Sequence, residues 1–211
     1  MDLSYSDSLI RIPDLSSTAP DLEILRLKNC AILHDIPSSL EKLSKLIELD
    51  LSGCYSVRHC PEIPCNIRTL KLDGNGIEHL PSSIEHLSQL VEFSLKWCTR
   101  LVSIPNSIGE LKCLEEIHLN GCSNLQSLPE SIKKLSKLKQ LDLSGCERPK
   151  CIPELPSCLK DLVASGCTSL EYASTSFILL EKEGVQRLLF AGCDKLDEKV
   201  TEDVFKAHLL G

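Results

Sequence analysis

Aromatic residues are scarce in this sequence of 211 residues, which has one tryptophan, three tyrosines and four phenylalanines. Its core must therefore be aliphatic, and 39 leucines are available to build it. The sequence has no apolar run long enough to cross a bilayer, and its first ten residues lack the basic start and apolar stretch of a secretion signal. It also has no Asn-x-Ser/Thr acceptor for N-glycosylation. These absences predict an intracellular address, cytoplasmic or nuclear, and no membrane partner.

Motifs for catalysis and cofactor binding are absent as well. The sequence has no Gly-x-x-x-x-Gly-Lys-Ser/Thr phosphate loop, no Gly-x-Gly-x-x-Gly, no Gly-x-Ser-x-Gly and no His-Glu-x-x-His. No Cys-x-x-Cys pair supports a zinc site. The formal charge of −7 disfavours nucleic acid, because phosphates are bound by surfaces rich in Lys and Arg. We expect no enzyme activity and no cofactor, metal or nucleic-acid partner.

One stretch recurs along the chain. Residues 114–129 read LEEIHLNGCSNLQSLP, and their apolar spacing widens after Ile117 and Leu119, which is typical of a short strand that turns into an arc. Copies begin at Leu22, Leu46, Ile67, Leu90, Leu114, Leu138, Leu159 and Val185, with spacings of 21 to 26 residues. Such a period on a leucine grid is the signature of a leucine-rich-repeat solenoid. We predict an α/β fold, a curved arc of about eight to nine repeats with parallel strands on its concave face and short helical or extended Pro-rich segments on its convex side.

The alternation of side chains along each strand assigns the two faces of the sheet. In residues 46–51, Leu49 and Leu51 should point into the core, while Glu48 and Asp50 should point outward. We expect the outward residues to form a mainly acidic, partner-binding concave face. Its predicted members are Arg26, Glu48, Asp50, Lys71, Glu92, Ser94, Lys96, Trp97, Glu116, His118, Gln140, Asp142 and Asp161.

Two residues of this face allow a second interpretation. Trp97 lies outside the leucine grid and is either a binding anchor or packed against Tyr55 or a neighbouring arc. His118 is better explained as a solvated strand residue than as a metal ligand, because no second histidine shares its row.

Seven of the twelve cysteines occupy the ninth position of a repeat. With Asn75, which takes that position in one copy, they should form a structural ladder of small buried side chains: Cys30, Cys54, Asn75, Cys98, Cys122, Cys146, Cys167 and Cys193. A buried, reduced cysteine behaves as a small hydrophobic residue. We therefore expect thiols rather than disulfides, as is usual inside cells.

The convex segments fall into two kinds. Ser38 with Glu41, and Ser82 with Glu85, have the spacing of a capping box, which predicts a turn or two of helix. Leu40 and Leu43 would then pack beneath the sheet. Residues 60–66 and 151–158 carry two prolines each and should lack helix.

The repeats define the expected domain organisation. Residues 1–196 form the leucine-rich-repeat domain, in which residues 1–21 match the middle of a repeat and read as a truncated first copy. Solenoids need polar terminal repeats, so we expect the chain to be an excerpt or truncated copy of a longer protein. Residues 197–211 should form an amphipathic helix that begins a post-repeat domain.

Several segments resemble one protein family. The opening MDLSYSDSLIRIPDLSSTAPDLEILRLKNC, the middle PEIPCNIRTLKLDGNGIEHLPSSIEHLSQLVEFSLKWCTRLVSIPNSI and the repeated LDLSGC are similar to the leucine-rich-repeat region of plant TIR-type nucleotide-binding disease resistance proteins. The tail LLFAGCDKLDEKVTEDVFKAHLL resembles the start of the domain that follows those repeats. The sequence contains neither a TIR nor a nucleotide-binding domain, so signalling, nucleotide binding and NAD cleavage are not carried over to any residue.

The resemblance implies a non-catalytic recognition module of plant innate immunity. In that family the repeats sense pathogen effectors and hold the receptor inactive against its nucleotide-binding domain, so an effector or such a domain is the implied protein partner of a monomer. Alternatives are a substrate-recruiting adaptor of a ubiquitin ligase and a receptor fragment without function. A thiol enzyme using a Gly-Cys pair near His118, or a secreted solenoid with disulfides, fits the sequence less well.

Overall fold

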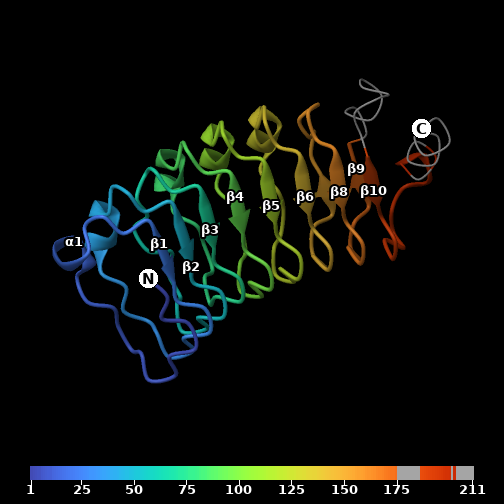
Figure 1. Cartoon of the computed structure of the whole chain (residues 1–211). Helices are drawn as coiled ribbons and strands as arrows, with labels where there is room; N and C mark the ends of the chain where they lie inside the picture. Colours follow the sequence, from blue (N-terminus) through green and yellow to red (C-terminus); the bar gives the residue numbers. More distant parts are fainter. Residues whose placement is uncertain (175–185, 201, 203–211) are drawn as a thin grey trace.

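The computed structural model describes residues 1–174, 186–200 and 202. Within them, eight three-residue strands form one parallel sheet that follows the chain in order along a curved arc (Figure 1). The strands are β1 (Ile24–Arg26), β2 (Glu48–Asp50), β3 (Thr69–Lys71), β4 (Glu92–Ser94), β5 (Glu116–His118), β6 (Gln140–Asp142), β8 (Asp161–Val163) and β10 (Arg187–Leu189). The predicted solenoid of parallel strands is confirmed.

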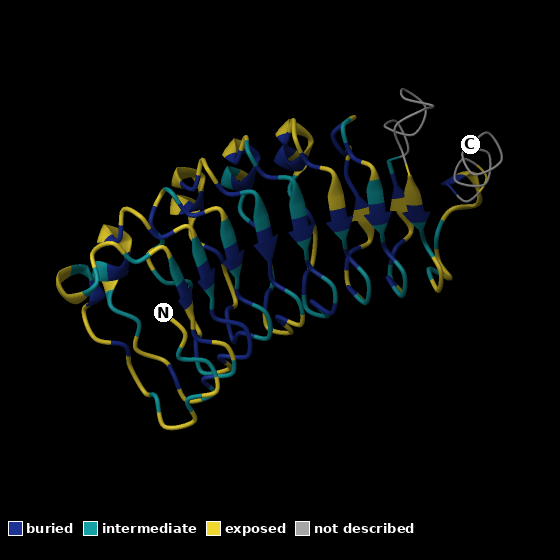
Figure 2. Ribbon diagram, viewed as in Figure 1, coloured by how far each residue is buried: buried dark blue, intermediate teal, exposed yellow. Residues whose placement is uncertain are grey.

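The strands are stacked in register. Glu48 lies opposite Ile24 on one side and Thr69 on the other, and the same correspondence continues to β10. The middle residue of every strand is buried, and the core lies between the sheet and the convex segments (Figure 2). The parity that the sequence assigned to Leu49, Glu48 and Asp50 is therefore correct.

The first residues add a partial rung to the sheet. Asp2 forms an isolated parallel bridge with Arg26, and the backbone N–H of Leu3 donates to the carbonyl of Arg26 at 2.8 Å. A four-residue helix, α1 (Leu15–Thr18), follows on the convex side and is capped by Asp14, whose carboxylate accepts the backbone N–H of Ser16. Leu15 packs into the core.

The predicted convex helices are present, but they are single short turns and no side chain caps their first residues. Four five-residue 3-10 helices lie along the arc: η1 (Ser38–Lys42), η2 (Ser82–His86), η3 (Asn106–Glu110) and η4 (Glu130–Lys134). A proline precedes each, and no side chain caps their N-termini, so the capping-box prediction at Ser38 and Ser82 is wrong. The proline ring fixes φ near −70° and leads directly into the tight turn, which makes Ser38 the first helical residue. Leu40 and Leu43 are buried as predicted.

The two Pro-rich segments lack helix, as predicted. One of them contributes an element that the sequence did not reveal. Cys151–Ile152 forms β7, which pairs in parallel with β9 (Tyr172–Ala173) in a second, two-stranded sheet. The extended path that proline imposes on residues 151–156 leaves these backbone groups free for such a ladder.

The C-terminal expectations are only partly covered by the described residues. The predicted helix over 197–211 falls largely outside them, although residues 198–200 are helical. The domain boundary at residue 196 stays a prediction. No helix in the described part of the chain has the length and apolar character needed to cross a membrane.

The ninth-position side chains connect each repeat to the one before it. Six of the seven cysteines are buried, Cys193 is half-buried and Asn75 is buried. Each thiol donates to a backbone carbonyl of the preceding repeat at 3.0 to 3.3 Å, as Cys122 does to Leu95. Asn75 does the same through its amide nitrogen, which donates to the carbonyl of Leu51 at 2.9 Å. Every donor of this ladder therefore bridges two turns of the solenoid.

Burial raises the pKa of four ladder thiols, whereas the hydrogen bond with Cys167 lowers the pKa of Cys193 to about 7. Because a thiolate loses its hydration in the core, burial raises the pKa of Cys54, Cys98 and Cys146 to about 12. The pKa of Cys122 is raised by the same cause. In the unfolded chain these thiols ionise near pH 8.5, roughly the value of a free cysteine. The stability that comes from keeping them protonated is complete below that pH and is lost as the pH rises toward 12.

This linkage predicts a specific pH dependence of stability. Between pH 8 and pH 10, the thiols of Cys54, Cys98, Cys122 and Cys146 should each lower the free energy of unfolding by about 2 kcal/mol, since only the unfolded chain ionises there. The fall measured by urea denaturation should therefore be smaller by about that amount in Cys98→Ala. The exposed Cys65 provides the matched control. Cys65→Ala should follow the wild type, and an equal fall in all three proteins would contradict the assignment.

Candidate protein-binding surface

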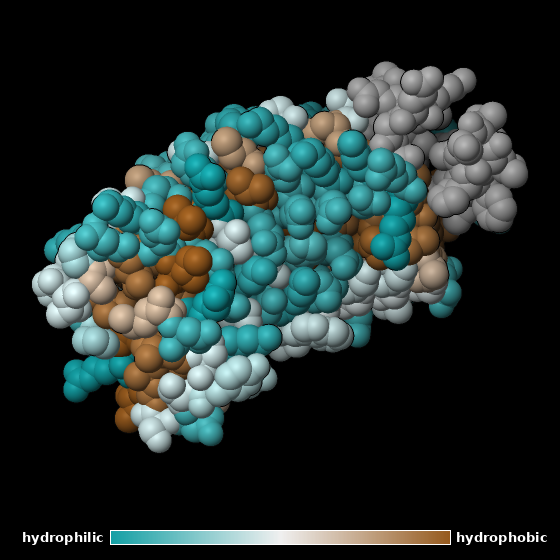
Figure 3. All heavy atoms as spheres, in the orientation of Figure 1, coloured by the Kyte–Doolittle hydropathy of each residue, from teal (hydrophilic) through white to brown (hydrophobic). Residues whose placement is uncertain are grey.

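The outward residues of the strands form two parallel rows. The first row consists of the first residue of each strand and contains Glu48, Glu92, Glu116, Gln140 and Asp161. The second row consists of the third residue and contains Arg26, Asp50, Lys71, His118 and Asp142. In-register stacking brings the members of each row side by side across the sheet. In the space-filling view, hydrophilic residues cover the face over β4 to β6, and hydrophobic residues gather around β1 and β2 (Figure 3).

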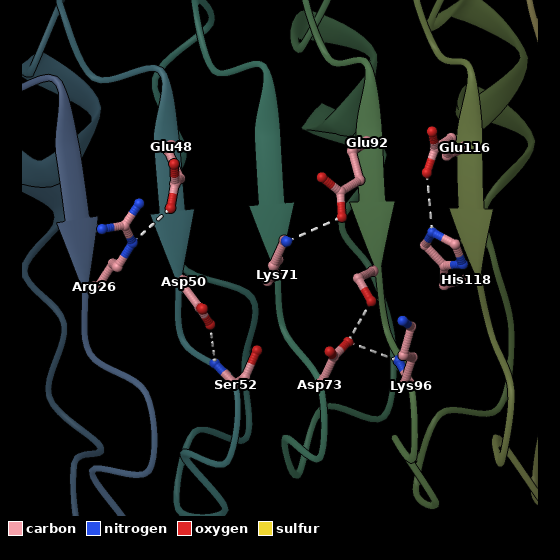
Figure 4. A network of polar contacts seen from close by, with 11 residues as sticks. Arg26, Glu48, Asp50, Ser52, Lys71, Asp73, Glu92, Lys96, Glu116 and His118 are labelled. Atoms are coloured by element: carbon pink, nitrogen blue, oxygen red, sulfur yellow. Dashed lines mark hydrogen bonds and ion pairs between the residues drawn. The ribbon is translucent and has the colours of Figure 1, made fainter. Parts of the chain in front are cut away.

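The charges at the N-terminal end of this face are paired with one another. Arg26 Nε lies 2.8 Å from Glu48 Oε1, and Lys71 Nζ lies 3.1 Å from Glu92 Oε1 (Figure 4). Partial burial acts to lower the pKa of Lys71, but the hydrogen bond and charge of Glu92 and the nearby acids outweigh it and raise that pKa. These four side chains therefore present little net charge to a partner.

The acids further along the arc are not neutralised in this way. Glu116 lies beside the ring of His118, with Oε2 and Nε2 3.3 Å apart, and forms no ion pair with a described lysine or arginine. Asp142 accepts the backbone N–H and the hydroxyl of Ser144, and Asp161 has no ion pair among the described residues. Gln140, between them, is exposed. None of these carboxylates forms an ion pair with a described lysine or arginine, although Arg187 of β10 is the register neighbour of Asp161. The face over β5, β6 and β8 is therefore mainly acidic.

One predicted contact residue is buried. Ser94 is only 1% exposed, and its hydroxyl donates to Asp73 Oδ1 at 2.5 Å. The same carboxylate oxygen accepts the backbone N–H of Lys96 at 2.9 Å. Ser94 is thus no contact residue, because a side chain of the neighbouring rung covers it. Sequence reasoning missed Asp73, since the parity count ends with the strand and Asp73 lies two residues beyond β3.

Trp97 is both packed and exposed. Its ring lies against Gly121, where an added Cβ atom would come within 2.3 Å of a ring carbon, yet the residue is 64% exposed. The ring therefore packs on the next turn, as one of the sequence interpretations proposed. Tyr55 is also 64% exposed and lies over Gly74 in the same manner. Both residues line a hollow of about 630 Å³ beside the ends of β2 and β3. Asp73, which accepts the backbone N–H of Lys96, also lines it.

The turn after each strand explains the position of Trp97. Its central residue has a left-handed backbone conformation, which glycine adopts at low cost. Within the described residues, Gly53, Gly74, Gly121, Gly145, Gly166 and Gly192 hold this position with φ between +66° and +78°. Trp97 has φ +59°, a conformation that costs a bulky residue about 1 kcal/mol.

The arrangement offers ion pairing and aromatic contact. In the described part of the chain, no group of three or more His, Cys, Asp or Glu residues is arranged to hold a metal ion. The raised pKa of the Cys54 thiol leaves it protonated at neutral pH and therefore a poor nucleophile. What remains is a polar concave face with an aromatic edge.

A stacked parallel sheet with this leucine grid defines a leucine-rich-repeat solenoid, a fold that serves protein interaction. The sequence matches the family model described as "Leucine-rich repeat region" over residues 8–177. The chain belongs to this family.

The sequence is similar to segments of several plant disease resistance proteins. Disease resistance protein RRS1 of Arabidopsis thaliana is 39% identical over 75 residues, which cover 36% of this chain and 5% of that protein. Protein SUPPRESSOR OF npr1-1, CONSTITUTIVE 1 of the same plant is 46% identical over 61 residues, or 29% and 4% of the two chains. Disease resistance protein RPS4B is 35% identical over 72 residues, or 34% and 6%. The predicted resemblance to the repeat region of plant resistance proteins is confirmed, and the matched segments span only a few per cent of those proteins.

Solved structures share the fold. The leucine-rich repeat domain of the type III effector XopL is 29% identical, with a TM-score of 0.58, over 74% of this chain and 65% of that domain. The ectodomain of the receptor kinase GASSHO1/SCHENGEN3 from Arabidopsis thaliana has a TM-score of 0.58 at 23% identity and covers 88% of this chain and 26% of its own. At that identity the likeness concerns the fold alone.

The contact between Trp97 and Gly121 can be tested by a matched pair of substitutions. Gly121→Ala and Gly145→Ala both place a side chain at a left-handed turn, but only the first meets a tryptophan ring, because the nearest atoms to a Cβ at Gly145 are 3.7 Å away. Gly145→Ala should cost about 1 kcal/mol of unfolding free energy and Gly121→Ala about 1 kcal/mol more. In a Trp97→Gly background the two costs should become equal. Equal costs with Trp97 present would show that the ring does not rest on this turn.

Proposed function

We propose that this chain is a non-catalytic recognition module of the kind found in plant intracellular immune receptors, and that it binds a partner protein through its concave face. The family to which it belongs and its similarity to plant resistance proteins support this proposal. The partner would be a pathogen effector or the nucleotide-binding domain of a receptor. The module would act inside the cell, in the cytoplasm or nucleus, as a monomer.

The observation that carries the proposal is the uneven charge of the concave face. The N-terminal strands neutralise their own charges through the pairs Arg26–Glu48 and Lys71–Glu92. Glu116, Asp142 and Asp161 have no such partner among the described lysines and arginines. Unneutralised charge on one patch steers and orients a partner of the opposite sign, so a partner with a basic patch is favoured.

The pairing pattern also selects the residues for a test. Reversal of Glu92 would break its ion pair with Lys71, and reversal of Asp142 would remove the hydrogen bonds to Ser144. Glu116 and Asp161 are the better choice, because their replacement disturbs neither of these contacts.

The double variant Glu116→Lys, Asp161→Lys should therefore lose partner binding without loss of fold. We expect proteins retained by the immobilised chain from plant leaf extract to fall about tenfold in quantity by mass spectrometry, as like charges now face each other. The urea midpoint should remain close to that of the wild type, because surface substitutions usually change stability by about 0.5 kcal/mol or less.

The control carries the same charge change elsewhere. Glu130, in η4, and Glu147 are exposed and take part in no ion pair among the described residues. The double variant Glu130→Lys, Glu147→Lys should retain the same proteins as the wild type. Retention that is unchanged by the concave reversal, or lost equally in the control, would contradict binding through this face.

A further inference from the structure

The hollow between Tyr55 and Trp97 has the features of a pocket for one side chain of a partner. It measures about 630 Å³ and lies where β2 and β3 end. Two aromatic residues line it, each 64% exposed, and the backbone of Gly53 and Gly74 contributes to the same lining. Exposed aromatic rings beside a hollow are common anchors of protein interfaces.

The polar lining of this hollow is acidic. Asp50 Oδ1 accepts the backbone N–H of Ser52 at 2.9 Å, and Asp73 Oδ1 accepts from Ser94 and Lys96. In the described part of the chain, no hydrogen bond reaches Oδ2 of either carboxylate. These two oxygens are therefore available to a ligand, and Figure 4 shows both aspartates on the same side of the sheet.

The cations of the hollow do not cancel this charge. The amine of Lys71 is engaged by Glu92 at 3.1 Å. Lys28 is the other cation of the lining, and it is exposed. With the Lys71–Glu92 pair neutral, two carboxylates face one lysine, so the hollow favours a cationic group.

The turn position of Trp97 has a backbone cost. Among the described turns, glycine holds this position six times, while Tyr5 (φ +62°), Asn29 (φ +57°) and Trp97 (φ +59°) hold it in the others. A bulky side chain is the more costly choice there. The ring of Trp97 lies against Gly121, yet 64% of the residue stays exposed to solvent. Trp97 therefore holds a large exposed ring beside the hollow at a position where glycine would cost less.

We propose that this hollow binds the guanidinium group of an arginine that a partner protein presents. The plane of a guanidinium stacks on an aromatic face, and its fixed fork of N–H donors matches carboxylate oxygens. Trp97 and Tyr55 supply the faces, while Asp50 and Asp73 supply the acceptors. An ammonium group lacks the planar fork, so arginine is preferred to lysine. The inference rests on the proposed function and names the chemistry of its partner.

Trp97 makes the test direct, because it is the only tryptophan of the chain and its fluorescence reports on this hollow. The probes are three peptides, acetyl-Gly-Gly-Xaa-Gly-Gly-amide, with arginine, citrulline or leucine in the middle. The arginine peptide should change the fluorescence saturably, and the citrulline peptide, which keeps the shape and loses the charge, should bind at least about fivefold more weakly. An equal response to leucine or citrulline, or no saturable response to arginine, would overturn the proposal.

Matched variants separate binding from folding. Asp50→Asn with Asp73→Asn keeps both Oδ1 acceptors and removes both charges, so it should weaken the arginine peptide at least about fivefold while the fluorescence reporter remains. Glu130→Gln with Glu147→Gln loses the same charge elsewhere and should bind like the wild type. Trp97→Gly should abolish binding in calorimetry without lowering the melting temperature, because glycine suits this turn. Unchanged binding in the Asp50, Asp73 variant would overturn the proposal.

The peptide experiment and the Glu116→Lys, Asp161→Lys experiment can fail independently of each other. Absence of an arginine response, together with retained proteins that depend on Glu116 and Asp161, would remove the arginine pocket and leave the recognition surface. An arginine response in a chain that retains no protein would support the pocket and contradict the recognition function.

Discussion

In-register stacking of parallel strands is the constraint on which the rest of the molecule depends. Each strand has only three residues, so neither its hydrogen bonds nor its buried face can be satisfied within one repeat. The middle residues meet their counterparts one strand away, and the thiols of the ladder donate to carbonyls of the preceding repeat. The same stacking that closes the core also aligns the outward residues into rows. The stacking of the strands therefore fixes both the core and the arrangement of the concave face.

The turn that follows each strand decides what the edge of the concave face can present. A left-handed residue is needed there to lead the chain away from the sheet, and glycine meets this need without a side chain. Glycine at Gly121 and Gly74 also leaves room for rings that belong to other residues. Trp97 and Tyr55 therefore rest on turns where glycine keeps the backbone cost low.

Much of this could be predicted from the sequence, because period and parity are properties of single strands. Strand positions, the parallel order and the absence of helix in residues 60–66 follow from spacing and proline alone. The short helices were harder, since a 3-10 turn and an α-turn share their apolar spacing over five residues. β7 and β9 depend on two irregular segments meeting, which no local pattern encodes.

The sequence likewise predicts one part of the candidate surface and not the other. Its rows follow from alternation, but the burial of Ser94 depends on Asp73 of the neighbouring rung. The pairing of Lys71 with Glu92, and its absence at Asp161, depend on rotamers chosen across strands. For Trp97 the sequence allowed an anchor or a packed ring, and the structure shows a ring that packs on Gly121 and stays 64% exposed.

The unequal lengths of the repeats have a further consequence. Glu48 and Thr69 are separated by 21 residues and Glu92 and Glu116 by 24, yet both pairs are direct neighbours in the sheet. The convex segments absorb the difference, either as a 3-10 helix or as an extended Pro-rich path. Recombination that adds or removes a whole repeat would therefore lengthen or shorten each outward row by one residue and leave every other position in place. Such a change would vary the concave face one rung at a time without rebuilding the core.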